Sequence, residues 1–268
     1  MMSNPSVANT VPRFRRVAID WQPEPVSARL RFGLVALATD HVSESELHRM
    51  MPPEEVDLFA TRTRHDGQCD IGSLRAMADG LAASCDLLLP GTPLDAIAYG
   101  CTSGTVAIGF DRVAATIRSQ RPGVAVTTPI SGAEAALRAL GVQRIAMLTP
   151  YVDEVNALVA DYLEGRGLEV TTLASFGLDT DIQMSTVPTE AIERAVLDMD
   201  STGAEGVFIC CTALRSVSTI APLEQRLGLP VISSNQAMLW EMLRASGYSR
   251  PIQGYGRLMA DLMVDGTG

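Results

Sequence analysis

The chain has 268 residues, of which 47% are hydrophobic and 19% charged, and its formal net charge at pH 7 is −10. This composition is typical of a globular protein, the length allows one large domain or two lobes, and no basic stripe for a nucleic-acid partner is present. All 21 Lys and Arg residues are Arg, which excludes a lysine Schiff base, as for pyridoxal phosphate, and the lysine of a P-loop.

Other classes of protein are disfavoured by what the sequence lacks. No apolar run reaches the roughly 18 residues of a membrane-spanning helix, and the N-terminus lacks the apolar core of a signal peptide. We therefore predict a cytoplasmic protein without a membrane partner. The cysteines are odd in number and contain no Cys-x-x-Cys pair, and the three His residues form no zinc signature. We expect neither a disulfide framework nor a metal site. A homo-oligomer is possible from the sequence.

The first half of the chain alternates between short apolar runs and segments of helical spacing. Residues 1–28 are rich in Pro, Ser and Val and are interpreted as an N-terminal extension. After them we predict strands at Arg31–Leu37, Val56–Ala60, Ala96–Tyr99 and Val124–Thr127, and helices at Ser43–Met51, Ile71–Leu87, Val106–Ser119 and Ala133–Leu140. Ser43 with Glu46 three residues later is a capping-box pattern.

The second half continues the same alternation. We predict strands at Arg144–Leu148, Glu169–Leu173, Gly206–Cys210 and Val231–Ser233, and helices at Val152–Arg166, Thr189–Leu197, Val217–Leu227 and Gln236–Ala245. Strands that alternate with helices of this length predict an α/β fold, with mainly parallel sheets flanked by helices.

Short sequence matches indicate that the unit is duplicated. VAVTT at 124–128 matches PVISS at 230–234, and LRALG at 137–141 matches LRASG at 243–247, both at an offset of 106; Cys101-Thr102 matches Cys211-Thr212 at an offset of 110. The alternative is that parallel α/β units simply look alike. The duplication predicts two pseudo-symmetric lobes, which we place at 29–128 plus 234–262 and at 129–233, with an active site between them.

The two Cys-Thr pairs contain the candidate catalytic residues. Each follows an apolar strand, and ligands of open parallel sheets bind beyond the carboxyl ends of the strands. Cys101 and Cys211 would then approach one cleft from opposite sides, where one thiolate acts on one face of a carbon and the other thiol delivers a proton to the opposite face. Backbone N–H groups after each cysteine, where the strand turns into a helix, would favour a thiolate and a bound anion.

The neighbouring residues fit a carboxylate ligand. Thr102, Ser103 and Thr212 supply hydroxyl donors. Tyr151 either reaches the same cleft with its hydroxyl or packs on Pro150 as a rim tyrosine. The remaining cysteines are interpreted as small buried apolar residues, with Cys210 directed away from the cleft; these are Cys69, Cys85 and Cys210.

Four segments resemble a known family. They are GCTS at Gly100–Ser103, the stretch Gly141–Val170, CCTAL at Cys210–Leu214 and GYGRL at Gly254–Leu258. Over roughly residues 31–258 the chain resembles the aspartate/glutamate racemase superfamily, in the branch of maleate cis-trans isomerase and arylmalonate decarboxylase, and it is also similar to the ectoine-utilisation proteins of this branch. The resemblance implies two pseudo-symmetric lobes, no cofactor and a site between the lobes.

The resemblance also assigns roles. It places Cys101 and Cys211 on the two catalytic positions. It matches Thr102, Ser103 and Tyr151 to hydroxyls that hold a carboxylate, and it places Thr212, at a backbone donor position, and Ala213 among the substrate-binding residues. The decarboxylase keeps only the second cysteine, which argues against that activity here. Amino-acid racemases carry Glu or His where this chain has Ala213, which argues against amino-acid racemisation.

Two further positions concern the substrate. Maleate isomerases carry an Asn in the loop after the first strand and another near the middle of the chain. Here the first loop reads Ala38-Thr39-Asp40, and Asp181 falls near the second position. An Asp that faces a dicarboxylate would repel it.

We therefore predict a cofactor-independent, two-cysteine isomerase that acts on a small carboxylic acid, with maleate-type cis-trans isomerisation favoured. Three alternatives stay open: a racemase of amino acids or other 2-substituted acids, an arylmalonate-type decarboxylase, and a carboxylate-binding protein without turnover. The substrate itself is not named by the sequence.

Overall fold

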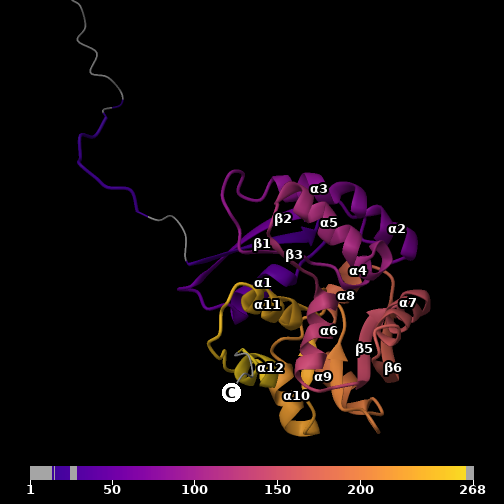
Figure 1. Cartoon of the computed structure of the whole chain (residues 1–268). Coiled ribbons are helices and arrows are strands. Elements are labelled where there is room, and N and C mark those ends of the chain that lie inside the picture. The colour runs from indigo at the N-terminus through magenta and orange to yellow at the C-terminus, as the bar shows by residue number, and fades with distance from the viewer. Residues whose placement is uncertain (1–13, 15, 25–28, 264–268) are drawn as a thin grey trace, which may run out of the picture.

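The computed structural model describes residues 14, 16–24 and 29–263 and contains two four-stranded parallel sheets (Figure 1). The first sheet has the order β2-β1-β3-β4 and the second β6-β5-β7-β8, so the same strand order occurs twice. The strands are β1 (Leu30–Leu37), β2 (Val56–Thr63), β3 (Ala96–Tyr99), β4 (Ala125–Thr127), β5 (Arg144–Tyr151), β6 (Glu169–Leu178), β7 (Gly206–Ile209) and β8 (Val231–Ser233). All eight predicted strands are present, and the predicted α/β class with two parallel sheets is confirmed.

Helices connect the strands and cover the sheets. They are α1 (Ser43–Met50), α2 (Ile71–Ala76), α3 (Ala78–Asp86), α4 (Thr102–Ile108), α5 (Phe110–Gln120), α6 (Pro129–Ala139), α7 (Asp153–Glu164), α8 (Asp181–Thr186), α9 (Thr189–Asp198), α10 (Ile220–Leu227), α11 (Ser234–Ala245) and α12 (Gly256–Asp261). The strands β3 and β7 are buried along their whole length, as expected of central strands in a covered parallel sheet.

Two predicted helices are each divided in the structure. The segment Ile71–Leu87 forms α2 and α3, which meet at Met77. The segment predicted at Val106–Ser119 forms α4, which begins earlier, and α5; between them Gly109 has a φ of +95°, a conformation that ends a helix. The short helices α8 and α12 were not predicted, because six residues show too little periodicity.

The capping box predicted at the start of α1 is wrong. Val42 occupies the N-cap position and provides no side-chain cap. Instead, the Asp40 carboxylate accepts hydrogen bonds from the backbone N–H groups of Val42 (2.7 Å) and Ser43 (2.9 Å). Glu46 turns into the interior, where it is 3% exposed.

Helix α11 lies at the centre of the molecule (Figure 1). It is buried around most of its circumference and packs on α1, on β3 and β4 of the first sheet, and on α6. The contact with α6 is close: a Cβ atom at Gly132 would lie 2.5 Å from the carbonyl oxygen of Ala237. The two predicted lobe boundaries stay a prediction.

Part of the predicted N-terminal extension is described by the structure (Figure 1). Its described residues, 14 and 16–24, are exposed and contain neither helix nor strand. The rest of the predicted extension over 1–28 lies outside the described residues. Within the described part of the chain, no helix is long and apolar enough to cross a membrane.

Candidate functional site

The two Cys-Thr pairs lie in the wall of one cavity. β3 and β7 end two residues before Cys101 and Cys211, and these cysteines are 5% and 6% exposed. The cavity is narrow, with a volume of about 20 Å³. It is lined by Leu37, Asp40, Cys69, Leu74, Cys101, Thr102, Ser103, Tyr151, Asp181, Cys211, Thr212 and Ala213. All seven residues that the sequence analysis placed at a site line this cavity, whereas Cys85 and Cys210 do not.

Cys101 caps the helix that follows it. It is the N-cap residue of α4, and its Sγ accepts a hydrogen bond from the backbone N–H of Gly104 at 3.2 Å. Position 104 has no room for a side chain, because a Cβ atom there would lie 2.8 Å from this Sγ and 2.5 Å from the terminal methyl of Met77. The glycine therefore allows the thiol to sit against the helix N-terminus.

Cys211 has a strained backbone. Its φ of +138° is rare for a residue with a side chain, and such conformations persist where surrounding contacts enforce them. Its N–H donates to the Ser234 hydroxyl at 2.9 Å, and its Sγ accepts from the N–H of Ala213 at 3.3 Å. No helix follows directly, since α10 begins at Ile220. The expected strand-to-helix turn is thus present after Cys101 and absent after Cys211.

Hydrogen bonds join the loops that carry the two cysteines. The Thr102 hydroxyl donates to the Ser234 hydroxyl at 3.0 Å, and the Thr212 hydroxyl donates to the carbonyl oxygen of Gly100 at 3.2 Å. A hydroxyl has one proton, so both threonines already use their donor within the protein. The Oγ of Ser103, another expected hydroxyl donor, lies 4.0 Å from the Cys101 sulfur.

Tyr151 is part of the site and not of its rim. It ends β5 and is 1% exposed, so the alternative of a rim tyrosine packed on Pro150 is wrong. Its hydroxyl contact lowers the pKa of the Cys211 thiol, although burial acts more strongly in the opposite direction. Tyr151 is therefore placed to donate toward a thiolate or toward a ligand beside it.

Burial favours the protonated form of both thiols. Burial raises the pKa of Cys101 far above its ordinary value and that of Cys211 to about 12. The expected backbone donors are present at Gly104 and Ala213 and lower these pKa values, but burial outweighs them. Thiolate formation at either position is therefore opposed by burial and favoured by these N–H donors.

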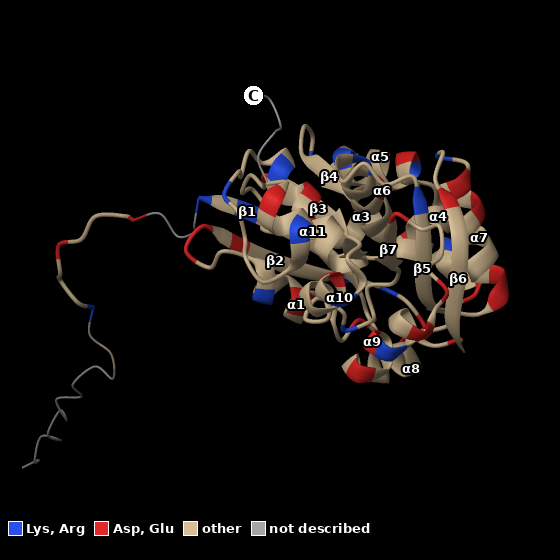
Figure 2. Ribbon diagram, turned by 90° about the horizontal axis from the view of Figure 1, so that it is seen from below, with Lys and Arg blue, Asp and Glu red and all other residues tan. Residues whose placement is uncertain are grey.

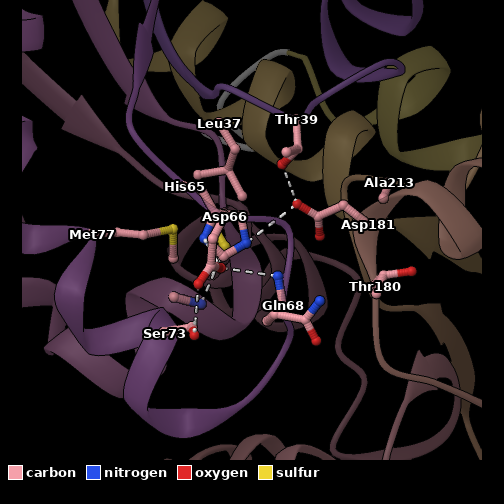
Figure 3. A network of polar contacts seen from close by, with 12 residues as sticks. Leu37, Thr39, His65, Asp66, Gln68, Ser73, Met77, Thr180, Asp181 and Ala213 are labelled. Atoms are coloured by element: carbon pink, nitrogen blue, oxygen red, sulfur yellow. Dashed lines mark hydrogen bonds and ion pairs between the residues drawn. The ribbon is translucent and has the colours of Figure 1, made fainter.

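Five lining residues were not assigned to the site by the sequence analysis, namely Leu37, Leu74, Cys69, Asp40 and Asp181. Cys69 is buried as expected but contacts the cavity, and Asp40 and Asp181 line it as well. Cys69 and Asp181 come together because Gln68 and Thr180 pair as an isolated antiparallel bridge between the loop after β2 and the start of α8 (Figure 3). Only the two aspartates carried a signal in the sequence, through their resemblance to asparagine positions.

The chain matches known proteins along most of its length. The family model for arylmalonate decarboxylase matches residues 107–259, more than half of the chain. The arylmalonate decarboxylase of Bordetella bronchiseptica is 32% identical over 56% of this chain, a match that spans 63% of that protein's length. The maleate isomerase of Nocardia farcinica is 26% identical over 85% of this chain and 95% of its own.

A solved structure shares the whole fold. It is a maleate cis-trans isomerase variant from Nocardia farcinica with a covalently bound succinylcysteine intermediate, and it covers 86% of this chain and 98% of its own at 23% identity with a TM-score of 0.77. The duplicated sheets described above are thus those of the maleate isomerase fold. By its family match, the chain belongs to the arylmalonate decarboxylase family of enzymes, in the branch of the aspartate/glutamate racemase-like superfamily that also contains maleate isomerase.

Proposed function

We propose that the protein is a two-cysteine isomerase of a small carboxylic acid, with cis-trans isomerisation of the maleate-isomerase type as its leading reaction. The observation that carries this proposal is the convergence of Cys101 and Cys211, from the ends of β3 and β7, on one buried cavity. Two thiols around one ligand allow chemistry on both of its faces, whereas a single thiol can act on only one face.

The proposed reaction has three steps, which are addition, rotation and elimination. One cysteine thiolate forms a bond to an alkene carbon, and the electron pair of the double bond moves toward the carboxylate, as an enediolate. Rotation then occurs about the new single bond. The electron pair returns to re-form the alkene in its trans geometry and expels the thiolate. The second thiol stands ready to protonate the neighbouring carbon and to take that proton back.

The protein supports this sequence in two ways. Backbone N–H groups at Gly104 and Ala213 already donate to the two sulfurs, which stabilises a thiolate before attack and after expulsion. Ser103 and Tyr151 line the same cavity and provide hydroxyls within it for a developing enediolate. Burial keeps water from competing for the thiolate or the carbanion.

Decarboxylation is the second candidate function, and the family match favours it. The relative from Bordetella bronchiseptica is an arylmalonate decarboxylase, and in that reaction Cys211 would protonate an enediolate after loss of carbon dioxide. Cys101 has no task in this version, although it is as buried and as well hydrogen-bonded as Cys211. For that reason the isomerase is preferred.

The test follows small acids by proton NMR in heavy water. Maleate, related cis-alkenoic acids, chiral 2-substituted acids and an arylmalonate are incubated with the protein, before and after treatment with iodoacetamide. Formation of a trans acid that is abolished by alkylation supports the isomerase. Deuterium at the α-carbon together with both enantiomers would indicate a racemase instead, and loss of carbon dioxide a decarboxylase. Binding of an acid without any conversion would leave a carboxylate-binding protein.

A further inference from the structure

Two carboxylates share the cavity with the two cysteines. Asp40 follows β1, and Asp181 is the first residue of α8 and only 9% exposed. Both line the cavity, and no Arg or His is among the lining residues. A ligand in this space therefore meets two acidic side chains and no basic one.

Asp181 is fixed on one side and open on the other (Figure 3). Its Oδ2 accepts the Thr39 hydroxyl at 2.5 Å, with Nε2 of His65 at 3.3 Å. Its backbone N–H donates to the carbonyl oxygen of Gly67 at 3.0 Å. Within the described part of the chain, no hydrogen bond reaches its Oδ1. The carboxylate is thus oriented by Oδ2 and retains Oδ1 as an acceptor for a ligand.

Asp40 shows the same division between its two oxygens. Oδ1 accepts the backbone N–H groups of Val42 and Ser43 at the start of α1. Oδ2 is buried and has no hydrogen-bond partner among the described residues. A buried carboxylate oxygen without a donor is destabilising, and such atoms are rare in folded proteins. A donor that arrives with a ligand would satisfy it.

The cations nearby do not neutralise this pair. Arg62 donates to the backbone carbonyl oxygen of Asp40 at 2.8 Å and forms an ion pair with Glu44. His65 lies between Asp181 and Asp66, with Nδ1 at 3.7 Å from the Asp66 carboxylate. Four carboxylates therefore lie around one guanidinium and one imidazole, so the net charge of the group is negative. The carboxylates are those of Asp40, Glu44, Asp66 and Asp181.

We propose that the substrate is a small zwitterion with one carboxylate and one cationic nitrogen, and that Asp40 and Asp181 select the nitrogen. Its N–H groups donate to the free oxygens of the two aspartates, in charge-assisted hydrogen bonds. Its carboxylate takes the hydroxyl and backbone donors around the cysteines. A dicarboxylate would instead bring a second negative charge against two others in a buried space. This inference rests on the proposed function, since it concerns the same cavity.

The two cysteines are affected by the charges of the same aspartates. After burial, the charge of Asp181 is the next factor that raises the pKa of the Cys101 thiol, and the charges of Asp181 and Asp40 also raise that of Cys211. A cationic nitrogen between these aspartates offsets their effect. Binding of a zwitterion thereby favours the thiolate that the reaction needs, whereas binding of a dianion opposes it.

A matched pair of probes tests the selection. Maleate and cis-4-aminobut-2-enoate share a cis-alkene and one carboxylate, and differ in that the second carboxylate is replaced by an aminomethyl group. Dissociation constants are measured by titration calorimetry at pH 7 for the wild-type chain and for Asp181→Asn and Asp40→Asn. Asp66→Asn is the control, because Asp66 flanks His65 from outside the cavity.

The wild-type protein should bind the aminobutenoate at least about tenfold more tightly than maleate. Each of Asp181→Asn and Asp40→Asn should shift this ratio toward maleate by about tenfold or more, and Asp66→Asn should leave it within about twofold. Asparagine retains the acceptor oxygen for Thr39 or for the α1 backbone, so folding is preserved; if one variant fails to fold, the other and the wild-type ratio still decide.

The inference is overturned if the wild-type protein binds maleate as tightly as the aminobutenoate, if it binds neither, or if the ratio is unchanged in both folded variants. Turnover of the same samples is followed by proton NMR. Selective binding of the aminobutenoate without conversion of any alkenoic acid would refute the proposed isomerase and leave the charge selection standing. Conversion of maleate with no preference for the zwitterion would refute the charge selection and leave the proposed isomerase standing.

Discussion

Among single residues, Cys211 combines three features that rarely occur together. It is buried, its φ of +138° is strained, and its sulfur receives a backbone N–H. Strain of this kind costs about 1–3 kcal/mol and persists where the neighbouring structure enforces it. At Cys211 the enforcing contact comes from Ser234, which also accepts the hydroxyl of Thr102 in the other cysteine loop. One serine therefore links the positions of both cysteine loops.

The first prediction concerns the two sulfurs. Cys101→Ser and Cys211→Ser should each lower the turnover of the cognate acid by at least about 100-fold, because an alcohol is a far weaker nucleophile and base than a thiol near neutral pH. Initial rates measured by proton NMR check this. Cys85→Ser, which lies away from the cavity, is the control and should retain turnover. A similar loss in all three variants would point to stability and against a shared catalytic role.

The second prediction concerns Ser234. Ser234→Ala leaves the N–H of Cys211 and the hydroxyl of Thr102 buried without a partner, which should lower the free energy of unfolding by about 2 kcal/mol. Because Cys211 then loses the contact that fixes its backbone, kcat should fall more than KM rises. Urea unfolding and steady-state kinetics measure the two effects.

Ser84→Ala provides the comparison for Ser234→Ala. Ser84 is also buried, but its hydroxyl donates to carbonyl oxygens of Arg62 and Gly80, away from the cysteines. It should lose stability without a change in kcat. If Ser234→Ala behaves in the same way, the serine is structural only and does not position Cys211.

At the level of helices and strands, the sequence predicted most of what positions the site. The apolar runs located every strand, and the parallel α/β alternation placed Cys101 and Cys211 at strand ends, where the structure has them. The break at Gly109 and the way in which α1 is capped were missed because they depend on individual contacts, such as the hydrogen bonds of the Asp40 carboxylate with two N–H groups. Local periodicity does not encode contacts of this kind.

The residues that line the cavity, and their pKa values, were less predictable because they also depend on tertiary contacts. Cys69 reaches it only because the loop after β2 pairs with the loop before α8, between segments more than 100 residues apart. The raised pKa values of the two thiols depend on how completely the final packing removes water, whereas the sequence showed only the helix N–H groups that oppose this effect. Tertiary packing decides both features.

The third prediction concerns Glu46, which joins α1 to α11 and to the loop after Cys211. Its carboxylate accepts the N–H of Val217 at 3.0 Å and the amide of Asn235 at 2.8 Å, and Asn235 also donates to the carbonyl oxygen of Thr212. Burial raises the pKa of Glu46 from 4.5 to about 7. A carboxyl with a raised pKa stabilises the fold fully below its unfolded pKa, and this contribution disappears as the pH rises through 7.

For Glu46 this amounts to about 3 kcal/mol between pH 4.5 and 7.5. Glu46→Gln should remove this dependence, so that the variant gains stability relative to the wild-type chain as the pH rises. The Asn235 amide can turn to match the new donor, since its Oδ1 has no other partner among the described residues. Urea unfolding at pH 5 and pH 8 measures the difference. Glu44→Gln, on the exposed side of α1, is the control, and equal pH slopes for wild type and Glu46→Gln would contradict the account.

For the whole molecule, the duplicated fold creates the site. Each four-stranded sheet contributes one cysteine, and α11 packs between elements of both halves. Acidic residues recur along the helices α7 and α9 (Figure 2). The cavity is lined by hydroxyl groups from both cysteine loops, and no Arg is among its lining residues. The sequence repeat predicted this convergence, since matched strand ends must meet if the halves face each other.

The central claim is that Cys101 and Cys211 contact the same small acid, and labelling of the intact protein tests it directly. The wild-type chain is treated with iodoacetate at pH 8.5 and examined by intact-protein and peptide mass spectrometry. Because one carboxymethyl group fills the shared space, each chain should carry the label on Cys101 or on Cys211 but not on both, and an excess of the cognate acid should protect both positions together. Chains labelled at both cysteines, or protection of only one of them, would contradict the account.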